Sequence, residues 1–307
     1  MRRRLLSVLP LVALSIAGCS SAGPSRSSSP PPAVPPSASV ASSSSAVATQ
    51  TPSKSVSPTR STAARRPTTS AAGRTSAARR TVAPPVSYSG TTVVLNPGHN
   101  GGNASHTAEI SRLVPAGYGD YKACDTTGTE TNAGYSEHAF NWDVAKRVRA
   151  LLQAHGVHVV MTRPDDTGVG PCVDERAAIG NRAGVAAVIS IHADGAPSSG
   201  HGFHVNQDSR RPDGASAATA QRSLDLGRAL HDALQQSSGL VPSTYIGSNG
   251  YYYRSDLAGL NLATRPATFL ELGNMRNSGD AARQSSAAGR ERIASAVAAG
   301  ILAFLGR

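Results

Sequence analysis

The chain has 307 residues, and its formal net charge of +11 is spread unevenly along its length. Eleven of the 30 Lys and Arg residues precede residue 91, where there is no Asp or Glu, and the other 19 basic residues equal the 19 acidic ones. The neutral remainder argues against a nucleic-acid-binding domain, so no nucleic-acid partner is expected. The basic segment could lie on anionic lipid or wall polymer, or serve only as a soluble linker.

Residues 1–18 have the layout of a bacterial export signal. Three arginines precede about a dozen mostly apolar residues, a stretch too short to span a bilayer as a helix. The residues "IAGC" that end at Cys19 resemble a lipobox, in which the cysteine is acylated and becomes the mature N-terminus. An ordinary signal peptide with an incidental cysteine is the alternative. We expect an exported lipoprotein, held by Cys19 on the outer face of the cytoplasmic membrane.

Residues 19–87 differ sharply in composition from the rest of the chain. They are rich in Ser, Pro, Ala, Thr and Arg and contain almost no large apolar side chains. Such a segment cannot bury enough surface to offset its loss of conformational entropy, so we expect a disordered tether. Residues 88–307 are long enough for one domain with a sizeable core.

The folded part alternates strands with helices. Continuous apolar runs such as "VAAVISIH" (185–192) are typical of strands that are covered on both faces. The alternation predicts a single α/β domain with a largely parallel twisted sheet flanked by helices on both faces. Strands are expected at 91–96, 157–162, 185–192, 201–206 and 265–273, and helices at 136–155, 174–183, 218–236 and 284–304.

The folded part contains two cysteines besides Cys19. Cys124 and Cys172 are an even pair in an oxidising compartment, so a disulfide is expected, and two buried free thiols are the alternative. Cys124 belongs to residues 103–131, which are rich in Gly, Thr and Asn and are interpreted as a long loop. A disulfide would pin this loop against the segment before the 174–183 helix.

Polar residues occur where the predicted strands end. His99 follows the first strand, His192 closes the third apolar run, and Glu271 lies inside the last. Ligand sites of parallel sheets form outside the carboxyl ends of the strands, so these side chains would lie close together. Two histidines and a carboxylate are the ligand set of a catalytic zinc site. Each residue alone also has a structural interpretation, such as a hydrogen-bonded core histidine.

Glu137 is a further candidate. It lies in the first turn of the predicted 136–155 helix and shares the face of Phe140, Val144 and Val148, so it would point to the rim of the core. A glutamate at this place commonly only complements the helix dipole. Position alone therefore leaves its role open.

Five motifs give the sequence a specific resemblance. "LNPGHNGG", "GYSEHAFNWDVA", "VVMTRPDD…DERAAIGN", "VISIHADG" and "FLELGNMRN" occur in the order and spacing of zinc-dependent N-acetylmuramoyl-L-alanine amidases, the amidase_3 family. The similarity covers residues 91–305 and is strongest to mycobacterial-type single-domain enzymes. It implies that His99, Glu137 and His192 bind one zinc ion (Zn²⁺) per chain and that Glu271 is the catalytic residue.

The resemblance also implies the reaction. The enzyme would hydrolyse the amide bond between N-acetylmuramic acid and L-alanine in peptidoglycan or muropeptides, in cell-wall remodelling and daughter-cell separation. Gly98, Gly101 and Gly102 would make room beside His99 for the metal, its water and this bulky substrate. We expect a monomer. A zinc carboxypeptidase or endopeptidase acting on wall peptides and a catalytically inactive wall-binding lipoprotein remain as alternatives.

The match to the family includes a supporting motif and some departures. Thr162, Arg163, Arg176 and Asn181 match a motif that supports the fold and the site. Asn96 stands where the family usually has Asp, which predicts weaker orientation of His99. Asp194 replaces a common Asn, and "ELGNMRN" lacks the usual Gly-Phe after the glutamate. No departure removes a ligand, so they affect rate and specificity rather than the reaction.

Overall fold

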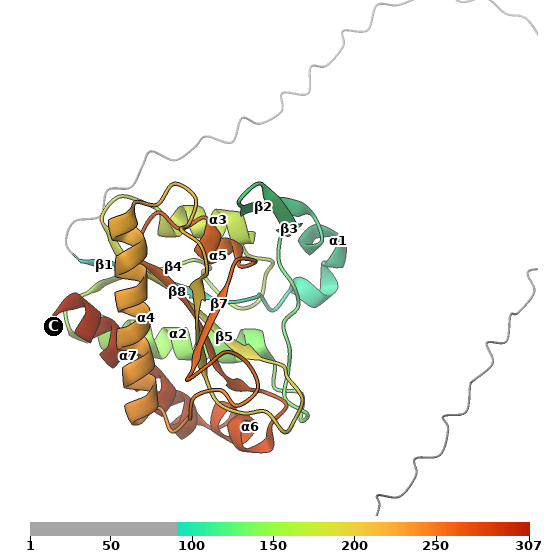
Figure 1. Ribbon diagram of the computed structural model, residues 1–307. Coiled ribbons are helices and arrows are strands. Elements are labelled where there is room, and N and C mark those ends of the chain that lie inside the picture. The colour runs from blue at the N-terminus through green and yellow to red at the C-terminus, as the bar shows by residue number, and fades with distance from the viewer. Residues whose placement is uncertain (1–90) are drawn as a thin grey trace, which may run out of the picture. The chain divides into compact units, whose positions relative to one another are not determined.

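The computed structural model describes residues 91–307 (Figure 1). The predicted signal segment 1–18, the lipid anchor at Cys19 and the tether 19–87 lie outside the described residues. Within 91–307, no helix is long and apolar enough to cross a membrane. The described α-helices are α1 Thr107–Ile110, α2 Glu137–Ala154, α3 Val173–Gly180, α4 Ala217–Ser237, α5 Ala258–Asn261, α6 Ser278–Ser285 and α7 Ala287–Leu305, with a 3₁₀ helix at Asn103–Ser105.

Six strands form the main sheet, in the order β4-β1-β5-β8-β6-β7. Every neighbouring pair is parallel except β8 and β6, so the predicted largely parallel α/β sheet is confirmed. A separate hairpin of β2 and β3 follows α1. The strands are β1 Thr92–Pro97, β2 Leu113–Gly117, β3 Asp120–Ala123, β4 His158–Met161, β5 Val185–Asp194, β6 His204–Asp208, β7 Tyr251–Arg254 and β8 Ala267–Asn274.

Different helices cover the two faces of the sheet (Figure 1). α2, α4 and α7 pack on one face, over the main core that contains Leu95 and Ile189. α3 and α5 cover the other face with a smaller cluster around Val94 and Leu260. Successive residues of a strand point to opposite faces, and both faces are covered. The central strands are therefore apolar almost throughout, as the continuous runs predicted.

The helix α2 shows how the local sequence sets the position of the site. Phe140, Val144 and Val148 are fully buried on one face of this helix, at the predicted four-residue spacing. Ser136 is in the extended conformation just before the helix, and Gly156 follows it with a positive φ of 70°. Glu137 is therefore the first helical residue, at the carboxyl edge of the sheet.

The prediction of a long loop at 103–131 is wrong for part of this segment. It contains the 3₁₀ helix, α1 and the β2–β3 hairpin. The strand pattern is weak because Pro115 interrupts β2 and Leu113 is 67% exposed, so the hairpin has no continuous apolar run. Gly117, Tyr118 and Gly119 all have positive φ and form its tight turn.

Some element ends also differ from the prediction. α3 begins at Val173, one residue before the predicted start at 174, because Cys172 is the N-cap and its backbone N–H donates to Glu175. α7 begins at Ala287 rather than 284, since extended Ser286 separates it from α6. The elements β7, α5 and α6 were not predicted, because all three are short.

The predicted disulfide between Cys124 and Cys172 is confirmed. Both sulfur-bearing residues are buried and pack with Val114 of the hairpin. The bridge connects the segment after β3 to the N-cap of α3. It therefore fixes the hairpin segment to the sheet face that α3 covers.

Replacing both Cys124 and Cys172 by Ser should lower the free energy of unfolding by about 2–4 kcal/mol, since the bridge restricts the unfolded chain. The sequence separation of 48 residues makes that restriction large. Urea denaturation of the oxidised protein measures the change, and Cys19→Ser is the matched control that leaves the bridge intact. An unchanged denaturation midpoint in the double variant would contradict the stabilising role.

Candidate metal centre

A cavity of about 450 Å³ opens at the carboxyl ends of β1, β5 and β8. His99, Glu137, His192 and Glu271 all line it. His192 and Glu271 lie in strands, Glu137 begins a helix, and His99 follows the end of β1, so the four residues are far apart in the sequence. Parallel strands bring their carboxyl ends to one edge of the sheet, which is why the residues meet there.

Three of these residues form a compact group. One nitrogen each of His99 and His192 and one oxygen of Glu137 lie within 4.8 Å of one another. The Glu137 carboxylate faces both rings, with Oε2 at 3.2 Å from His99 Nε2 and Oε1 at 3.0 Å from His192 Nδ1. Two imidazole nitrogens and a carboxylate fit a metal such as zinc, with a further position open to water or substrate.

The rest of each ligand side chain is held by the surrounding protein. His99 Nδ1 lies 2.9 Å from the Thr126 carbonyl, which accepts its proton and leaves Nε2 free to act as a ligand. The Glu137 carboxylate accepts hydrogen bonds from the backbone N–H groups of Thr129 and Ala193. These contacts orient both ligands toward the same point.

His192 is positioned by packing rather than by hydrogen bonds alone. Its ring stacks on Phe269, with centroids 4.1 Å apart and planes at 17°. On the other side it lies against Gly98, where an added Cβ would come 1.9 Å from ring atom Cε1. A Cβ at Gly101 would likewise lie 1.9 Å from the Asp166 carbonyl oxygen. The interpretation that these glycines make room for metal and substrate is therefore wrong, because protein atoms fill the space.

The space beside Gly102 is also filled by protein atoms. An added Cβ there would lie 2.8 Å from the backbone carbon of Gly168. The backbone N–H of Gly102 also donates to the Gly168 carbonyl, at 3.1 Å. The glycine pattern around His99 thus allows the segment 166–168 to pack closely against the end of β1.

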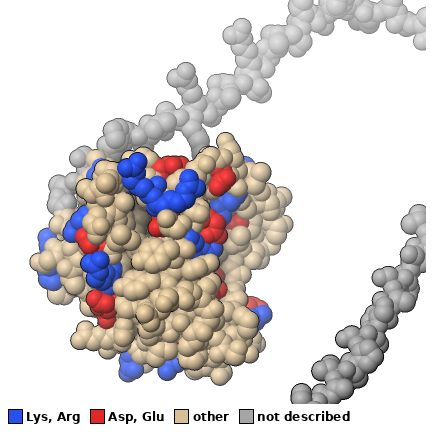
Figure 2. Space-filling view, viewed as in Figure 1, with Lys and Arg blue, Asp and Glu red and all other residues tan. Residues whose placement is uncertain are grey.

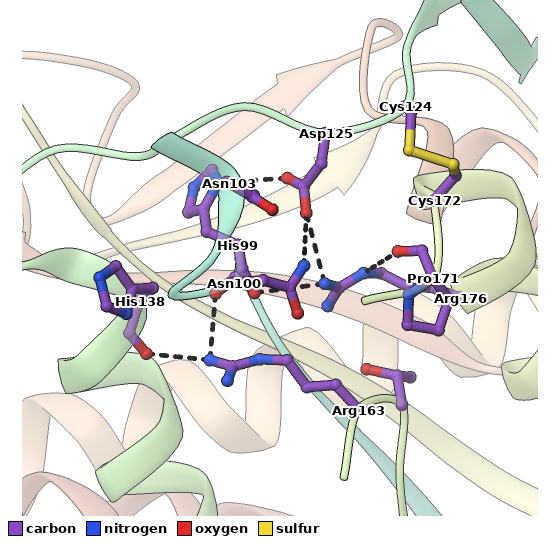
Figure 3. Close-up of polar contacts among 12 residues, drawn as sticks. His99, Asn100, Asn103, Cys124, Asp125, His138, Arg163, Pro171, Cys172 and Arg176 are labelled. Atoms are coloured by element: carbon purple, nitrogen blue, oxygen red, sulfur yellow. Dashed lines mark hydrogen bonds and ion pairs between the residues drawn. A yellow bond between two sulfur atoms is a disulfide. The ribbon is translucent and has the colours of Figure 1, made fainter. Parts of the chain in front are cut away.

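Two buried arginines hold the backbone around His99 (Figure 3). Arg163 Nε donates to the Pro97 carbonyl at 3.0 Å, and its Nη2 donates to the His138 carbonyl at 2.9 Å. Arg176 donates to the carbonyls of Pro97 and His99, at 2.8 and 3.2 Å. His99 has a positive φ of 58°, a conformation that is unfavourable for residues other than glycine. The two arginines, which were expected to support the site, therefore stabilise this turn.

Asn96, which is expected to affect the orientation of His99, is connected to it indirectly. Asn96 donates to Ser190 Oγ at 2.9 Å, and its Oδ1 accepts from Thr162 Oγ1 and Arg176 Nη1 at 2.8 and 2.9 Å. The amide thus connects β1 to β5 and to α3. Arg176, which also donates to the His99 carbonyl, connects Asn96 to this residue.

Asp125 is a site residue that the sequence reasoning missed. Its carboxylate lies 3.3 Å from His99 Nδ1 and from Arg176 Nη2, and accepts from Asn100 Nδ2 at 3.0 Å (Figure 3). Burial raises its pKa, but the contacts with His99 and Arg176 outweigh burial and lower that pKa to about 2. The available signal was its position directly after Cys124, whose disulfide fixes the segment.

Glu271 differs from the three grouped residues. It is paired with His192 in the parallel register of β8 and β5, so both side chains face the cavity. Its Oε2 is buried without a hydrogen-bond partner among the described residues. Burial raises the pKa of Glu271 well above its ordinary value, and the carboxylates of Glu137 and Asp194 raise it further. Such a group holds a proton more readily than an ordinary glutamate, which is a property of general acid–base groups.

The pKa values of His99 and Glu137 are shifted in opposite directions. Burial lowers the pKa of His99, but the carboxylates of Glu137 and Asp125 outweigh it and raise that pKa to about 10. Burial raises the pKa of Glu137, yet His99 and His192 hold it well below its ordinary value. The site therefore favours a cation beside Glu137, whether a proton or a metal ion.

Comparison with known proteins gives consistent matches. The model of the family Amidase_3, N-acetylmuramoyl-L-alanine amidase, matches residues 93–303. The N-acetylmuramoyl-L-alanine amidase Rv3717 of Mycobacterium tuberculosis is 47% identical over 223 residues, which are 73% of this chain and 90% of that protein.

Two solved structures agree with these matches. The N-acetylmuramyl-L-alanine amidase Ami1 from Mycobacterium smegmatis is similar with a TM-score of 0.66 and 46% identity, covering 72% of this chain and 99% of that chain. The apo form of Ami1 from Mycobacterium abscessus gives a TM-score of 0.65 and 47% identity, over 71% of this chain and 100% of that chain. The similarity thus extends over the described domain.

In the metal-free protein, His99 should make the fold less stable as the pH rises into the alkaline range. Its folded pKa of about 10 lies above the ordinary 6.5, so its stabilising contribution is complete below pH 6.5 and is lost as the pH rises toward about 10. Melting temperatures of EDTA-treated wild type and His99→Gln should therefore converge over this interval. Gln153, exposed on α2 and without an ionisable group, serves as the control, and Gln153→Asn should keep a constant difference from wild type. A pH-independent difference for His99→Gln would contradict the prediction.

Proposed function

The chain belongs to the Amidase_3 family and is an N-acetylmuramoyl-L-alanine amidase acting on peptidoglycan, and we propose that it uses zinc bound by His99, Glu137 and His192. We further propose Glu271 as the catalytic base. The observation that carries both assignments is the placement of the Glu137 carboxylate between two imidazole nitrogens, with Glu271 on the neighbouring strand position. When bound, one zinc ion per chain would polarise the scissile carbonyl and acidify water.

Contacts within the protein position the three proposed ligands. Glu137 would neutralise part of the metal charge, and the Thr126 carbonyl keeps the His99 ring in the tautomer that leaves Nε2 available as a ligand. Phe269 and Gly98 enclose the His192 ring, so it has little freedom to turn away. These contacts favour a preorganised site, which lowers the cost of binding the ion.

Glu271 would move the proton that the hydrolysis requires. Its carboxylate takes a proton from the attacking water, whose oxygen forms a bond to the lactyl carbonyl carbon. The carbon–nitrogen bond to L-alanine then breaks, and Glu271 passes the proton to the leaving nitrogen. The products are a free lactyl carboxyl group and a free amine, and Glu271 returns to its starting state. Its raised pKa suits both transfers.

The ligand set alone left three functions open: an amidase, a peptidase and an inactive binding protein. The family match assigns the muramoyl–alanine amide rather than a peptide bond as the substrate bond, so the peptidase interpretation is not retained. A catalytically inactive binding protein would not need an ionisable carboxyl with an unpartnered buried oxygen in the cavity. Mass analysis of digested muropeptides distinguishes the three, because only the amidase produces sugars with free lactyl groups and intact peptides.

The amidase acts outside the cytoplasm, where its substrate lies. We propose that it is anchored there by lipid on Cys19 after removal of residues 1–18, that residues 19–87 form a tether, and that it is a monomer. The "IAGC" sequence supports the anchor. The Cys124–Cys172 disulfide agrees with an oxidising, extracytoplasmic compartment.

Glu271→Gln should keep its zinc and fold but lose turnover by about 10²- to 10⁴-fold, since the amide cannot accept the proton. Glu137→Gln should behave differently, because a neutral amide is a weaker ligand and zinc is lost together with activity. The measurements are metal content and hydrolysis of a muropeptide for both variants and wild type.

The opposite pattern would reverse the assignment. If Glu271→Gln loses zinc while Glu137→Gln keeps both zinc and turnover, the two glutamates have exchanged roles. The exposed Glu291, in α7, provides a matched control, and Glu291→Gln should change neither quantity.

Cys19→Ser should move the protein from the membrane fraction to the soluble fraction without changing the activity of the folded domain. The expected change follows from loss of the acylated thiol, which is the only anchor in the proposal. Fractionation followed by immunoblotting measures it, with Ser21→Ala as the control that keeps the cysteine. Unchanged membrane association of Cys19→Ser would show that another feature holds the protein.

A further inference from the structure

The cavity of the candidate metal centre has two basic residues in its wall besides the buried Arg176. Lys122 of β3 and Arg254 at the carboxyl end of β7 line the same cavity as Glu271 and His192. Figure 2 shows Lys and Arg side chains gathered toward the top of one face of the domain. Lys122 and Arg254 come from two elements that are distant in the sequence, the β2–β3 hairpin and β7.

Asp256 holds the two basic residues together. Lys122 Nζ donates to the backbone carbonyl of Asp256 at 2.9 Å. Arg254 Nε and Nη2 donate to the two carboxylate oxygens of Asp256, each at 2.6 Å. Because both contacts are to one residue, the ammonium and the guanidinium lie at the same end of the cavity.

The charges at this end do not cancel. The Asp256 carboxylate compensates the charge of Arg254, whereas Lys122 donates to a neutral carbonyl. Among residues 91–307, no carboxylate forms an ion pair with Lys122. One positive charge therefore remains at the cavity wall, on a side chain that is half-buried. Burial lowers the pKa of Lys122 and the charge of Arg254 lowers it further, while the carboxylates of Asp256 and Asp125 oppose the shift without cancelling it.

Acidic residues line the same cavity. Glu137, Asp194 and Glu271 are among its lining residues, together with the two histidines. A ligand bound in the cavity would therefore meet the carboxylates and candidate metal ligands as well as the Lys122 ammonium. A substrate that has its scissile amide beside the candidate metal ligands and an anionic group beside Lys122 fits this distribution.

We propose that Lys122, supported by Arg254, binds a carboxylate of the stem peptide and selects peptides with free carboxyl groups over amidated ones. Lys122 makes the direct contact, because Asp256 already occupies the Nε–Nη2 edge of the Arg254 guanidinium. Two ammonium protons remain available to a carboxylate after the bond to the Asp256 carbonyl. The inference rests on the proposed function, since the stem peptide extends from the amide cleaved beside Glu271.

The test compares two synthetic muramoyl peptides that differ only in their carboxyl groups, free in one and amidated in the other. Wild type should have a KM about 10- to 100-fold lower for the free peptide, the range expected for a charge-assisted hydrogen bond. Lys122→Met keeps the length of the side chain but removes its charge, so it should raise KM for the free peptide alone. The kcat for either peptide should stay within about twofold, because Lys122 does not touch the reacting atoms.

Two further variants make the result specific. Lys146 is exposed on α2, outside the cavity, and Lys146→Met makes the same change of charge without altering the preference. Lys122→Arg restores a cation and should recover most of the preference. Equal KM values of wild type for the two peptides, or an equal rise for both peptides in Lys122→Met, would overturn the proposal.

A binding measurement separates this proposal from the proposed function. Calorimetric titration of the zinc-loaded Glu271→Gln variant with each peptide reports the preference without requiring turnover. If wild type cleaves neither peptide but the titration shows tighter binding of the free peptide, the carboxylate site stands and the hydrolytic assignment fails. Equal affinities in the titration refute the carboxylate site, whatever the activity.

Discussion

The metal centre depends on how two buried guanidinium groups hold the backbone at the end of β1. Arg163 and Arg176 both donate to the Pro97 carbonyl, and Arg176 also donates to that of His99. The left-handed conformation of His99 costs roughly 1–2 kcal/mol. Hydrogen bonds from a charged donor contribute about 1.5–3 kcal/mol each, enough to offset that cost. The turn that presents His99 is therefore maintained by residues that lie 64 and more positions later in the sequence.

The buried arginines need compensation in turn, and this requirement ties the disulfide to the metal centre. Asp125 forms an ion pair with Arg176 and also contacts His99 Nδ1. Burial lowers the pKa of Arg176 to about 10, although Asp125 opposes the shift, so the guanidinium stays charged at neutral pH. The Cys124–Cys172 bridge joins the residue before Asp125 to the cap of the helix that carries Arg176. A ligand, its counter-charge and the bridge thus form one connected unit.

Sequence reasoning identified the residues whose position follows from the parallel sheet. His99, His192 and Glu271 meet because their strands end at one edge, and Glu137 joins them because its helix begins there. Asp125 and Lys122 were not identified, because they lie in a segment without a periodic apolar pattern and make long-range contacts. The glycines near His99 were misinterpreted for a related reason. Their spacing indicates a close approach, but only the fold shows that His192 and residues 166–168 are the atoms that approach.

The distribution of charge in the cavity links metal binding to proton transfer. Glu137 attracts a cation between the two imidazoles, and the same carboxylate raises the pKa of Glu271. Compensation of the Glu137 charge therefore weakens the repulsion that Glu271 experiences and lowers its proton affinity. In the loaded site Glu271 would be ionised more readily, which is the state that its proposed role as a base requires. Desolvation is the larger cause of its raised pKa, and this cause does not depend on the charge of Glu137.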